Sequence, residues 1–228
     1  LDPWSIGRRM QAGRVAEEGA ARGLRIGWME QVGPFRTDPE VARLTAASVA
    51  VLAAEGASVE PIAPACFADV FSYYQVLATA AHATRMGAIV AQWGELITPA
   101  FRESAAIGAS WSGTDLLRAQ DRRAVLFREV QALFRRFDVL ATPTMLKPPP
   151  TVDAGGSICT EWYAEIAAPL YPFNLTGHPA ASVPAGFTAG GLPVGLQLVG
   201  PWLAEQRLLD LAALLEARQD FASRRPPL

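Results

Sequence analysis

The amino-acid sequence predicts an α/β domain in which helices pack against a mixed β-sheet. Short apolar runs bounded by glycine or proline alternate with segments whose apolar residues recur at helical spacing. Half of the 228 residues are hydrophobic and 18% are charged, which is a globular composition. This length allows one large domain or two small ones, and the sequence has no internal repeat. We therefore expect a single domain over residues 1–228, with a linker or helix over about residues 1–22.

The first predicted unit is a strand, a helix and a second strand. Residues 24–28 form a short apolar run between glycines, as expected for a buried strand. Thr37-Asp38-Pro39-Glu40 is typical of a helix start, because it combines a capping side chain, a proline that needs no N–H and an acid in the first turn. The helix should end at Gly56, and residues 57–60 read as extended. This order predicts a βαβ unit.

Two long helices are predicted next. Residues 67–93 follow a helical pattern, and a second helix begins near Ser112 or Thr114. The expected buried stripe of this second helix is Leu117, Ala124, Phe127, Val130 and Phe134. Four arginines, at positions 118, 122, 123 and 128, lie mostly off that stripe. They could form a binding patch, but a solvated helix face is the better interpretation.

The last third reads as strands and a closing helix. Residues 137–144 predict a strand that stops at a proline, followed by a proline-rich loop over residues 147–150. The loop is better read as a stiff connector than as a PxxP ligand. Residues 180–184 and 194–200 predict a hairpin. A final helix carries Leu208, Leu211, Ala212 and Leu215, and residues 220–228 form a tail.

Composition excludes several classes of function. The net charge of −2 gives no basic excess for binding nucleic acid. No apolar run approaches a membrane span and no signal-peptide pattern occurs, so we expect a cytoplasmic protein without a membrane partner. Cys66 and Cys159 lie far apart and in no metal-binding spacing, which favours two free thiols. We expect neither a metal nor a cofactor.

The segment from Asn174 to Gly200 is more specific. It reads NLTGHPAASVPAGF and, from Gly191, GLPVGLQLVG. This resembles the C-terminal signature of the amidase signature family, which includes bacterial amidases, fatty acid amide hydrolase and the glutamyl-tRNA amidotransferase A subunit. Residues 138–144, 24–27 and 2–3, and the helix containing Glu205, also resemble family segments in the same order. The resemblance implies the C-terminal part of the amidase-signature fold, with an incomplete sheet.

The resemblance also implies a chemistry whose residues are missing here. Family members hydrolyse amides with a neutral lysine that acts as base through one serine while a second serine attacks the carbonyl. All three belong to the first half of the family's domain, upstream of every segment matched here. The chain begins with Leu1 rather than Met, so we expect that it was cut or that an upstream part is missing. The chain alone is predicted to have no catalytic residue and to be inactive.

No substitute for these residues stands out. Lys147, the one lysine in the sequence, reads as a solvated surface residue, and the loop around Ser157 departs from the family's glycine-serine pattern. His82 suggests a core or surface histidine and His178 a loop histidine, rather than a catalytic triad or a metal site. Glu161 and Glu165 are better read as a polar helix face than as a catalytic pair.

By resemblance, this half contributes walls of the substrate pocket. The expected binding residues are Thr142, Thr144, Trp162, Tyr171, Phe173 and Asn174. Aromatic lining, to which Trp162 and Tyr163 would add, would favour an apolar or aryl amide. Amidotransferase A subunits carry an acid a few residues before the matching asparagine, whereas residues 166–169 here contain none. This argues against glutamine, although Glu165 lies close.

The predicted partner is therefore a small-molecule amide bound by the intact protein. A fragment of an amidotransferase A subunit remains an alternative. So does a non-catalytic binding or scaffold protein, whose exposed sheet edge would need a partner or a homodimer to cover it.

Overall fold

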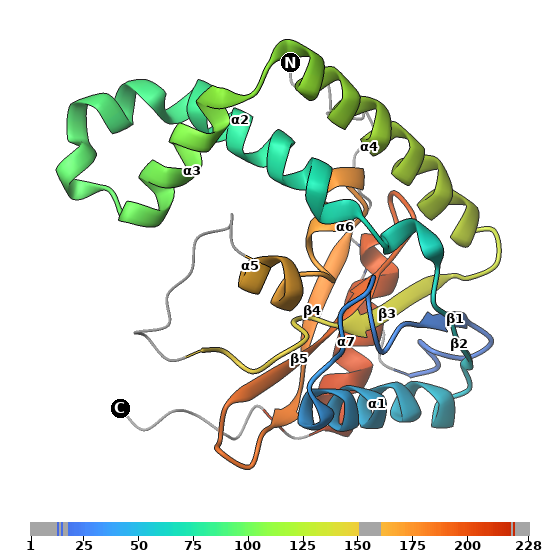
Figure 1. Cartoon of the computed structure of the whole chain (residues 1–228). Helices are drawn as coiled ribbons and strands as arrows, with labels where there is room; N and C mark the ends of the chain where they lie inside the picture. The colour runs from blue at the N-terminus through green and yellow to red at the C-terminus, as the bar shows by residue number, and fades with distance from the viewer. Residues whose placement is uncertain (1–12, 14, 16–17, 151–160, 220, 222–228) are drawn as a thin grey trace.

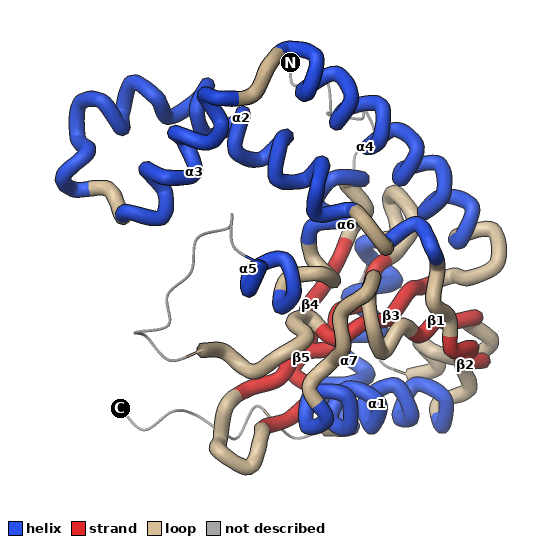
Figure 2. The backbone as a smooth tube through the Cα atoms, viewed as in Figure 1, coloured by secondary structure: helices blue, strands red, loops and turns tan. Residues whose placement is uncertain are grey.

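A computed structural model describes residue 13, residue 15, residues 18–150, residues 161–219 and residue 221. Most of the predicted N-terminal segment and of the tail lies outside these residues. The helices and strands, shown in Figures 1 and 2, are β1 (Arg25–Trp28), α1 (Pro39–Ala54), β2 (Ser58–Pro61), η1 (Ala65–Phe67), α2 (Val70–Trp93), η2 (Gly94–Leu96), α3 (Pro99–Ser110), α4 (Gly113–Leu133), β3 (Val139–Pro143), α5 (Glu161–Ile166), α6 (Tyr171–Thr176), β4 (Ala180–Phe187), β5 (Pro193–Val199) and α7 (Glu205–Arg218).

The strands form one mixed five-stranded sheet in the order β2-β1-β3-β5-β4. β1 pairs in parallel with β2 and β3, whereas β5 pairs antiparallel with β3 and β4. The predicted α/β class and mixed sheet are confirmed. The βαβ unit also forms as expected, with the Asp38 side chain accepting the N–H groups of Glu40 and Val41 at the start of α1. Gly56, with φ of +101°, follows the helix in a conformation that favours glycine.

Helices cover both faces of the sheet. α1 and α7 bury an aliphatic cluster against one face, with Leu52, Leu196, Leu211 and Leu215 at its centre. On the other face, α2, α4 and α6 enclose a more aromatic cluster that includes Phe67, Tyr171 and Phe173. β4 is the last strand of the sheet, so one of its edges has no neighbouring strand among the described residues.

The buried face of α4 differs from the prediction. Val130 is buried and Phe127 and Phe134 are half-buried, but Leu117 is 68% exposed and Ala124 is exposed. The helix instead buries Ala119 and Leu126. Residues two positions apart on a helix are separated by about 200°, so a face centred on Ala119 turns Leu117 to the solvent.

Two of the four arginines on α4 make specific contacts with other elements, which the interpretation as a solvated helix face did not include. Arg122 pairs with Asp69 at 2.7 Å and lies over the Tyr73 ring. Arg123 donates its Nε–H to the Leu175 carbonyl at 2.6 Å. Both contacts fix α4 to neighbouring elements, which sequence spacing could not show.

An arm made of the second half of α2, η2 and α3 extends away from the sheet (Figures 1 and 2). α3 was not predicted from the sequence. Its close approach to α2 depends on Gly108, because a side chain there would overlap the Thr79 carbonyl oxygen. Trp111 and His82 add bonds across the pair, to the hydroxyls of Thr79 and Ser104 respectively, both at 2.8 Å. In the described part of the chain, no helix is both long and apolar enough to span a membrane.

Candidate functional site

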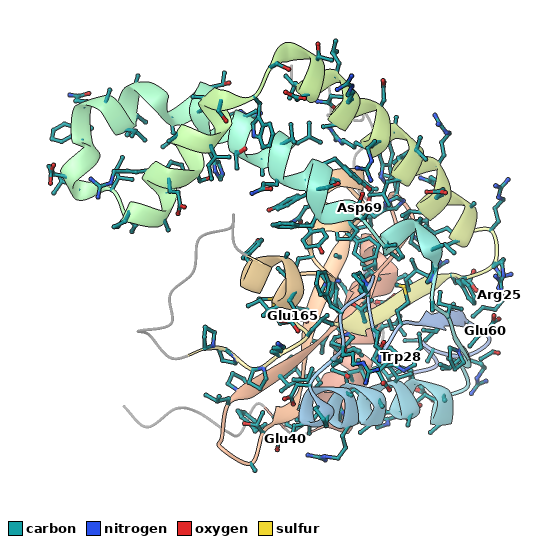
Figure 3. The ribbon with its side chains drawn as sticks, in the orientation of Figure 1. Arg25, Trp28, Glu40, Glu60, Asp69 and Glu165 are labelled. Atoms are coloured by element: carbon teal, nitrogen blue, oxygen red, sulfur yellow. The ribbon has the colours of Figure 1, made fainter. Side chains whose placement is uncertain are left out.

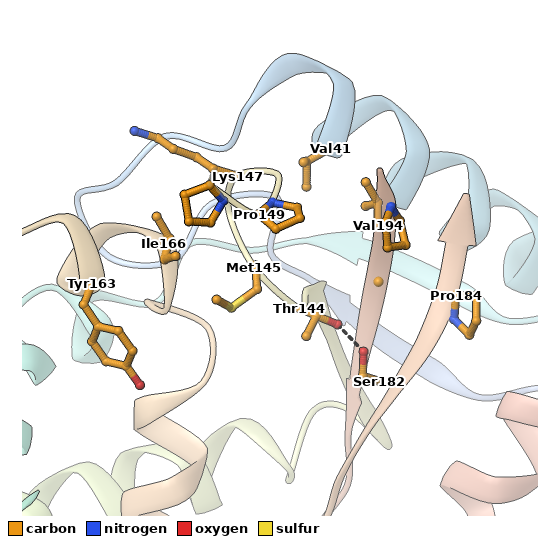
Figure 4. Close-up of a pocket in the computed structure, with 13 residues that line it drawn as sticks. Val41, Thr144, Met145, Lys147, Pro149, Tyr163, Ile166, Ser182, Pro184 and Val194 are labelled. Carbon is orange, nitrogen blue, oxygen red and sulfur yellow. Dashed lines mark hydrogen bonds between the residues drawn. The ribbon is translucent and has the colours of Figure 1, made fainter. Parts of the chain in front are cut away.

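The main cavity lies beside the ends of β3, β4 and β5, and its volume is about 660 Å³. It is built from residues distant in the sequence (Figure 4). Apolar side chains dominate its lining, which consists of Val41, Thr144, Met145, Lys147, Pro149, Pro150, Tyr163, Ile166, Ser182, Pro184, Pro193, Val194 and Gly195. Such a surface suits an apolar group of a small molecule.

Backbone bonds hold this cavity in shape. The Thr144 N–H donates to Gly195 O at 2.8 Å, and the Leu146 N–H donates to Ile166 O at 3.0 Å. The Asp38 N–H donates to Leu146 O at 2.8 Å, which ties the start of α1 to the loop after β3. The Glu40 side chain in turn accepts the Ala189 N–H, so it anchors the β4–β5 turn beside it (Figure 3).

Two hydroxyl groups face each other in the cavity. Thr144 Oγ1 and Ser182 Oγ are hydrogen-bonded at 2.7 Å (Figure 4). Gly195 makes this pairing possible, because a Cβ atom at this position would lie 2.7 Å from each of these oxygens. Ser182 therefore has a hydroxyl partner, and no base that could activate it contacts it among the described residues.

Lys147 lies at the edge of the cavity and points away from the hydroxyl pair (Figure 4). Its Nζ pairs with Glu165 Oε2 at 2.6 Å, and the two side chains are 40% and 31% exposed. The prediction of a solvated lysine therefore missed a specific partner. A catalytic lysine would have to be neutral and buried beside a hydroxyl. Lys147 instead lies in a partly exposed ion pair.

The six residues expected to bind substrate do not meet in this cavity. Of the five whose side chains the structure describes, only Thr144 lines it. Thr142 is buried and accepts a hydrogen bond from Gln197 Nε2, which also donates to Pro169 O. Trp162 belongs to α5, but its side chain lies outside the described residues.

The remaining three lie nearer to α2. The Tyr171 ring stacks on Tyr74 with a centroid distance of 5.2 Å, and its hydroxyl donates to Ala164 O. Phe173 packs edge-on against Phe67 in the core. Asn174 is exposed and lines a separate hollow between α2 and α4. All three residues belong to the short helix α6. Because successive side chains of a helix point in different directions, these near neighbours in the sequence face different surroundings.

Sequence reasoning missed several residues of the cavity. Ser182 and Gly195 both lie within the recognised motif, but their pairing needed the β4–β5 register, in which Ser182 stands opposite Gln197 and Pro184 opposite Gly195. Met145 and Val194 carried no sequence signal beyond their apolar character.

Two other residues considered in the sequence, His178 and Cys66, lie in surroundings that shift their pKa values. His178, predicted as a loop histidine, is buried among Phe127, Phe134 and Trp202, and burial lowers its pKa to about 4. Cys66 is a free thiol whose pKa burial raises to about 12, so it is a poor nucleophile. Ser157 and Cys159 lie outside the described residues. Within the described ranges, no group of His, Cys, Asp and Glu side chains is arranged to hold a metal ion.

Comparison with known proteins identifies the family to which this chain is related. The family model described as Amidase matches residues 5–209. The A subunit of a glutamyl-tRNA(Gln) amidotransferase from Synechococcus sp. (strain CC9605) is 32% identical over 89% of this chain and 46% of its own length. A putative amidase named AmiA2 from Mycobacterium tuberculosis is 42% identical over 49% of this chain and 24% of its own length.

Solved structures share the fold of this chain. A 6-aminohexanoate cyclic dimer hydrolase superposes with a TM-score of 0.79 at 25% identity, over 99% of this chain and 52% of that one. A bacterial aryl acylamidase has a TM-score of 0.75 at 24% identity, over 93% and 48% respectively. The chain thus spans about half the length of these relatives.

Proposed function

Since this chain belongs to the amidase family, we propose that it forms one wall of the substrate pocket of an enzyme that hydrolyses a small carboxamide. The products would be a carboxylate and ammonia or an amine. The serines and the lysine of the family's Ser-Ser-Lys chemistry would come from polypeptide outside these residues. The isolated chain would then be inactive.

The arrangement of the main cavity carries this proposal. It offers an apolar surface, a hydroxyl pair in mutual contact and a lysine paired with a carboxylate. These groups can bind and orient an apolar amide, but neither a base nor an activated nucleophile is among them. The structural relatives, which are about twice as long, have room for a catalytic half.

The same lining favours an apolar or aryl amide over glutamine. Glutamine carries an ammonium and a carboxylate, and both would need polar or charged partners. Among the described residues that line the cavity, the one charged side chain is that of Lys147, which is already paired with Glu165. Tyr163 and Met145 instead provide contact for a ring or an alkyl chain.

The test compares this chain with a longer polypeptide that adds the coding sequence preceding Leu1. Both are assayed against benzamide, an anilide and glutamine, with ammonia or amine release as the readout. We expect no turnover by the chain alone and turnover of the apolar amides by the longer protein. Amide hydrolysis by the chain alone would refute the assignment of catalysis to other residues.

A second candidate is a part of an amidotransferase A subunit. It is favoured by the 32% identity over 89% of this chain with such a protein. Preferential release of ammonia from glutamine by the longer protein would support this candidate instead.

The third candidate, a non-catalytic scaffold, requires a partner or a second copy on the open edge of β4. Light scattering measures the oligomeric state, and the fluorescence of a hydrophobic dye measures exposed apolar surface. A stable monomer that binds no such dye contradicts this role.

A further inference from the structure

A second cavity lies between α4, the end of α6 and the loop after β5. Its volume is about 330 Å³, at the lower end of the range for small-molecule sites. Its lining comprises an alanine, a leucine and six larger or polar residues: Gln120, Arg123, Phe127, Arg128, Thr176 and Trp202. It shares no lining residue with the cavity at Thr144. The two cavities therefore can bind different molecules.

Among the described residues, two charged groups line this second cavity, and both are guanidiniums. Arg123 is held in place by its bond to the Leu175 carbonyl, and burial lowers its pKa, as expected for a cation withdrawn from water. Arg128 is exposed on the same helix, and it takes part in none of the ion pairs found among the described residues. A guanidinium is planar and matches the geometry of a carboxylate. The charge of this cavity therefore favours an anion.

The side chains of Phe127 and Trp202 form an aromatic wall of this cavity, and contacts with neighbouring residues fix both of them. The rings of Phe127 and Trp202 lie 5.2 Å apart, and the Trp202 indole N–H donates to Thr176 O at 3.4 Å. Both rings also contact the buried His178 ring, whose Nδ1 bonds to the Thr176 hydroxyl at 2.8 Å. Since these contacts already restrain both rings, little side-chain freedom would be lost on binding. The wall suits a flat apolar body.

From these observations we propose that this second cavity binds a small aromatic carboxylate. The carboxylate would face Arg123 and Arg128, and the ring would lie against Phe127 and Trp202. The site would act independently of amide hydrolysis, so a failure of the proposed function leaves it standing.

Benzoate and its neutral counterpart benzamide distinguish this site from the apolar cavity at Thr144. Each is titrated into the chain, and its affinity for this site is measured from the NMR shift of the Trp202 indole N–H signal, because calorimetry would also record benzamide bound in the cavity at Thr144. We expect benzoate to shift that signal and to bind at least about tenfold more tightly than benzamide. Equal affinities, or shifts centred on Thr144 and Gly195, would overturn the proposal.

A matched pair of variants tests the role of charge. Arg128→Glu reverses a charge in the lining, whereas Arg118→Glu reverses an exposed charge on the same helix outside it. We expect a loss of about tenfold or more in benzoate affinity for the first and less than about twofold for the second. Equal losses would mean that benzoate responds only to net charge, which would overturn the proposal. The benzamide comparison decides the matter even if a variant folds poorly.

Discussion

Acidification from about pH 7 to about pH 4 should destabilise this protein through His178, and the geometry indicates by how much. The ring is only 6% exposed and stacks between aromatic side chains. Thr176 donates its hydroxyl proton to Pro172 O, so its oxygen accepts the Nδ1–H of His178. The Nε2 atom then carries a lone pair, and it has no partner among the described residues. A proton added there would enter an apolar cluster.

The magnitude follows from the shift in pKa. Burial lowers the pKa of His178 from 6.5 to about 4. Each pKa unit corresponds to about 1.4 kcal/mol, so the loss is about 3 kcal/mol when the pH reaches the folded-state value. The sign is unambiguous because the folded pKa is depressed. The unfolded chain takes up the proton first, so this stability is complete above about pH 6.5 and declines as the pH falls towards 4.

The assay is urea unfolding followed by circular dichroism at several pH values, for the native chain and His178→Phe. Phenylalanine suits the aromatic surroundings and cannot titrate, although it loses the bond to Thr176. The difference in unfolding free energy between the two proteins should change by about 3 kcal/mol across this range. Burial also lowers the pKa of His82, but this residue is common to both proteins and cancels. A difference that does not vary with pH would refute the reasoning.

Three further predictions concern packing and the lysine. Gln197→Leu should lower the free energy of unfolding by about 2 kcal/mol in the same assay, because it leaves the buried Pro169 carbonyl without its donor. An unchanged free energy of unfolding would contradict this. Gly108→Ala should separate α3 from α2 and lower the melting temperature, whereas Gly87→Ala on the same arm meets nothing within 4 Å and should be neutral or stabilising. In the longer protein, Lys147→Ala should change the rate of amide hydrolysis by less than about threefold, and a thousandfold loss in a rate assay would assign it a catalytic role.

The sequence predicted the elements that local rules define. The Asp38-Pro39 start of α1, the glycine after it and the apolar run of β1 were sufficient for the βαβ unit, because capping and burial act within a few residues. The motif from Asn174 to Gly200 identified the family, and the family match confirms this. Its strands formed the predicted hairpin.

Long-range packing decided the rest. α3 is held to α2 by the absence of a side chain at Gly108, and no periodicity announces such a contact. The buried face of α4 depends on which neighbours it meets, so Leu117 is exposed despite its apolar character. The Thr144–Ser182 pair depends on a strand register and on Gly195 between the two residues.

The sequence by itself determined the family, the fold class and the βαβ and hairpin units of this chain, because these follow from local conformational preferences and one long motif. Only the tertiary structure decided where its cavities lie. A cavity is formed by side chains that are distant along the chain, and the position of each depends on the packing of every element around it.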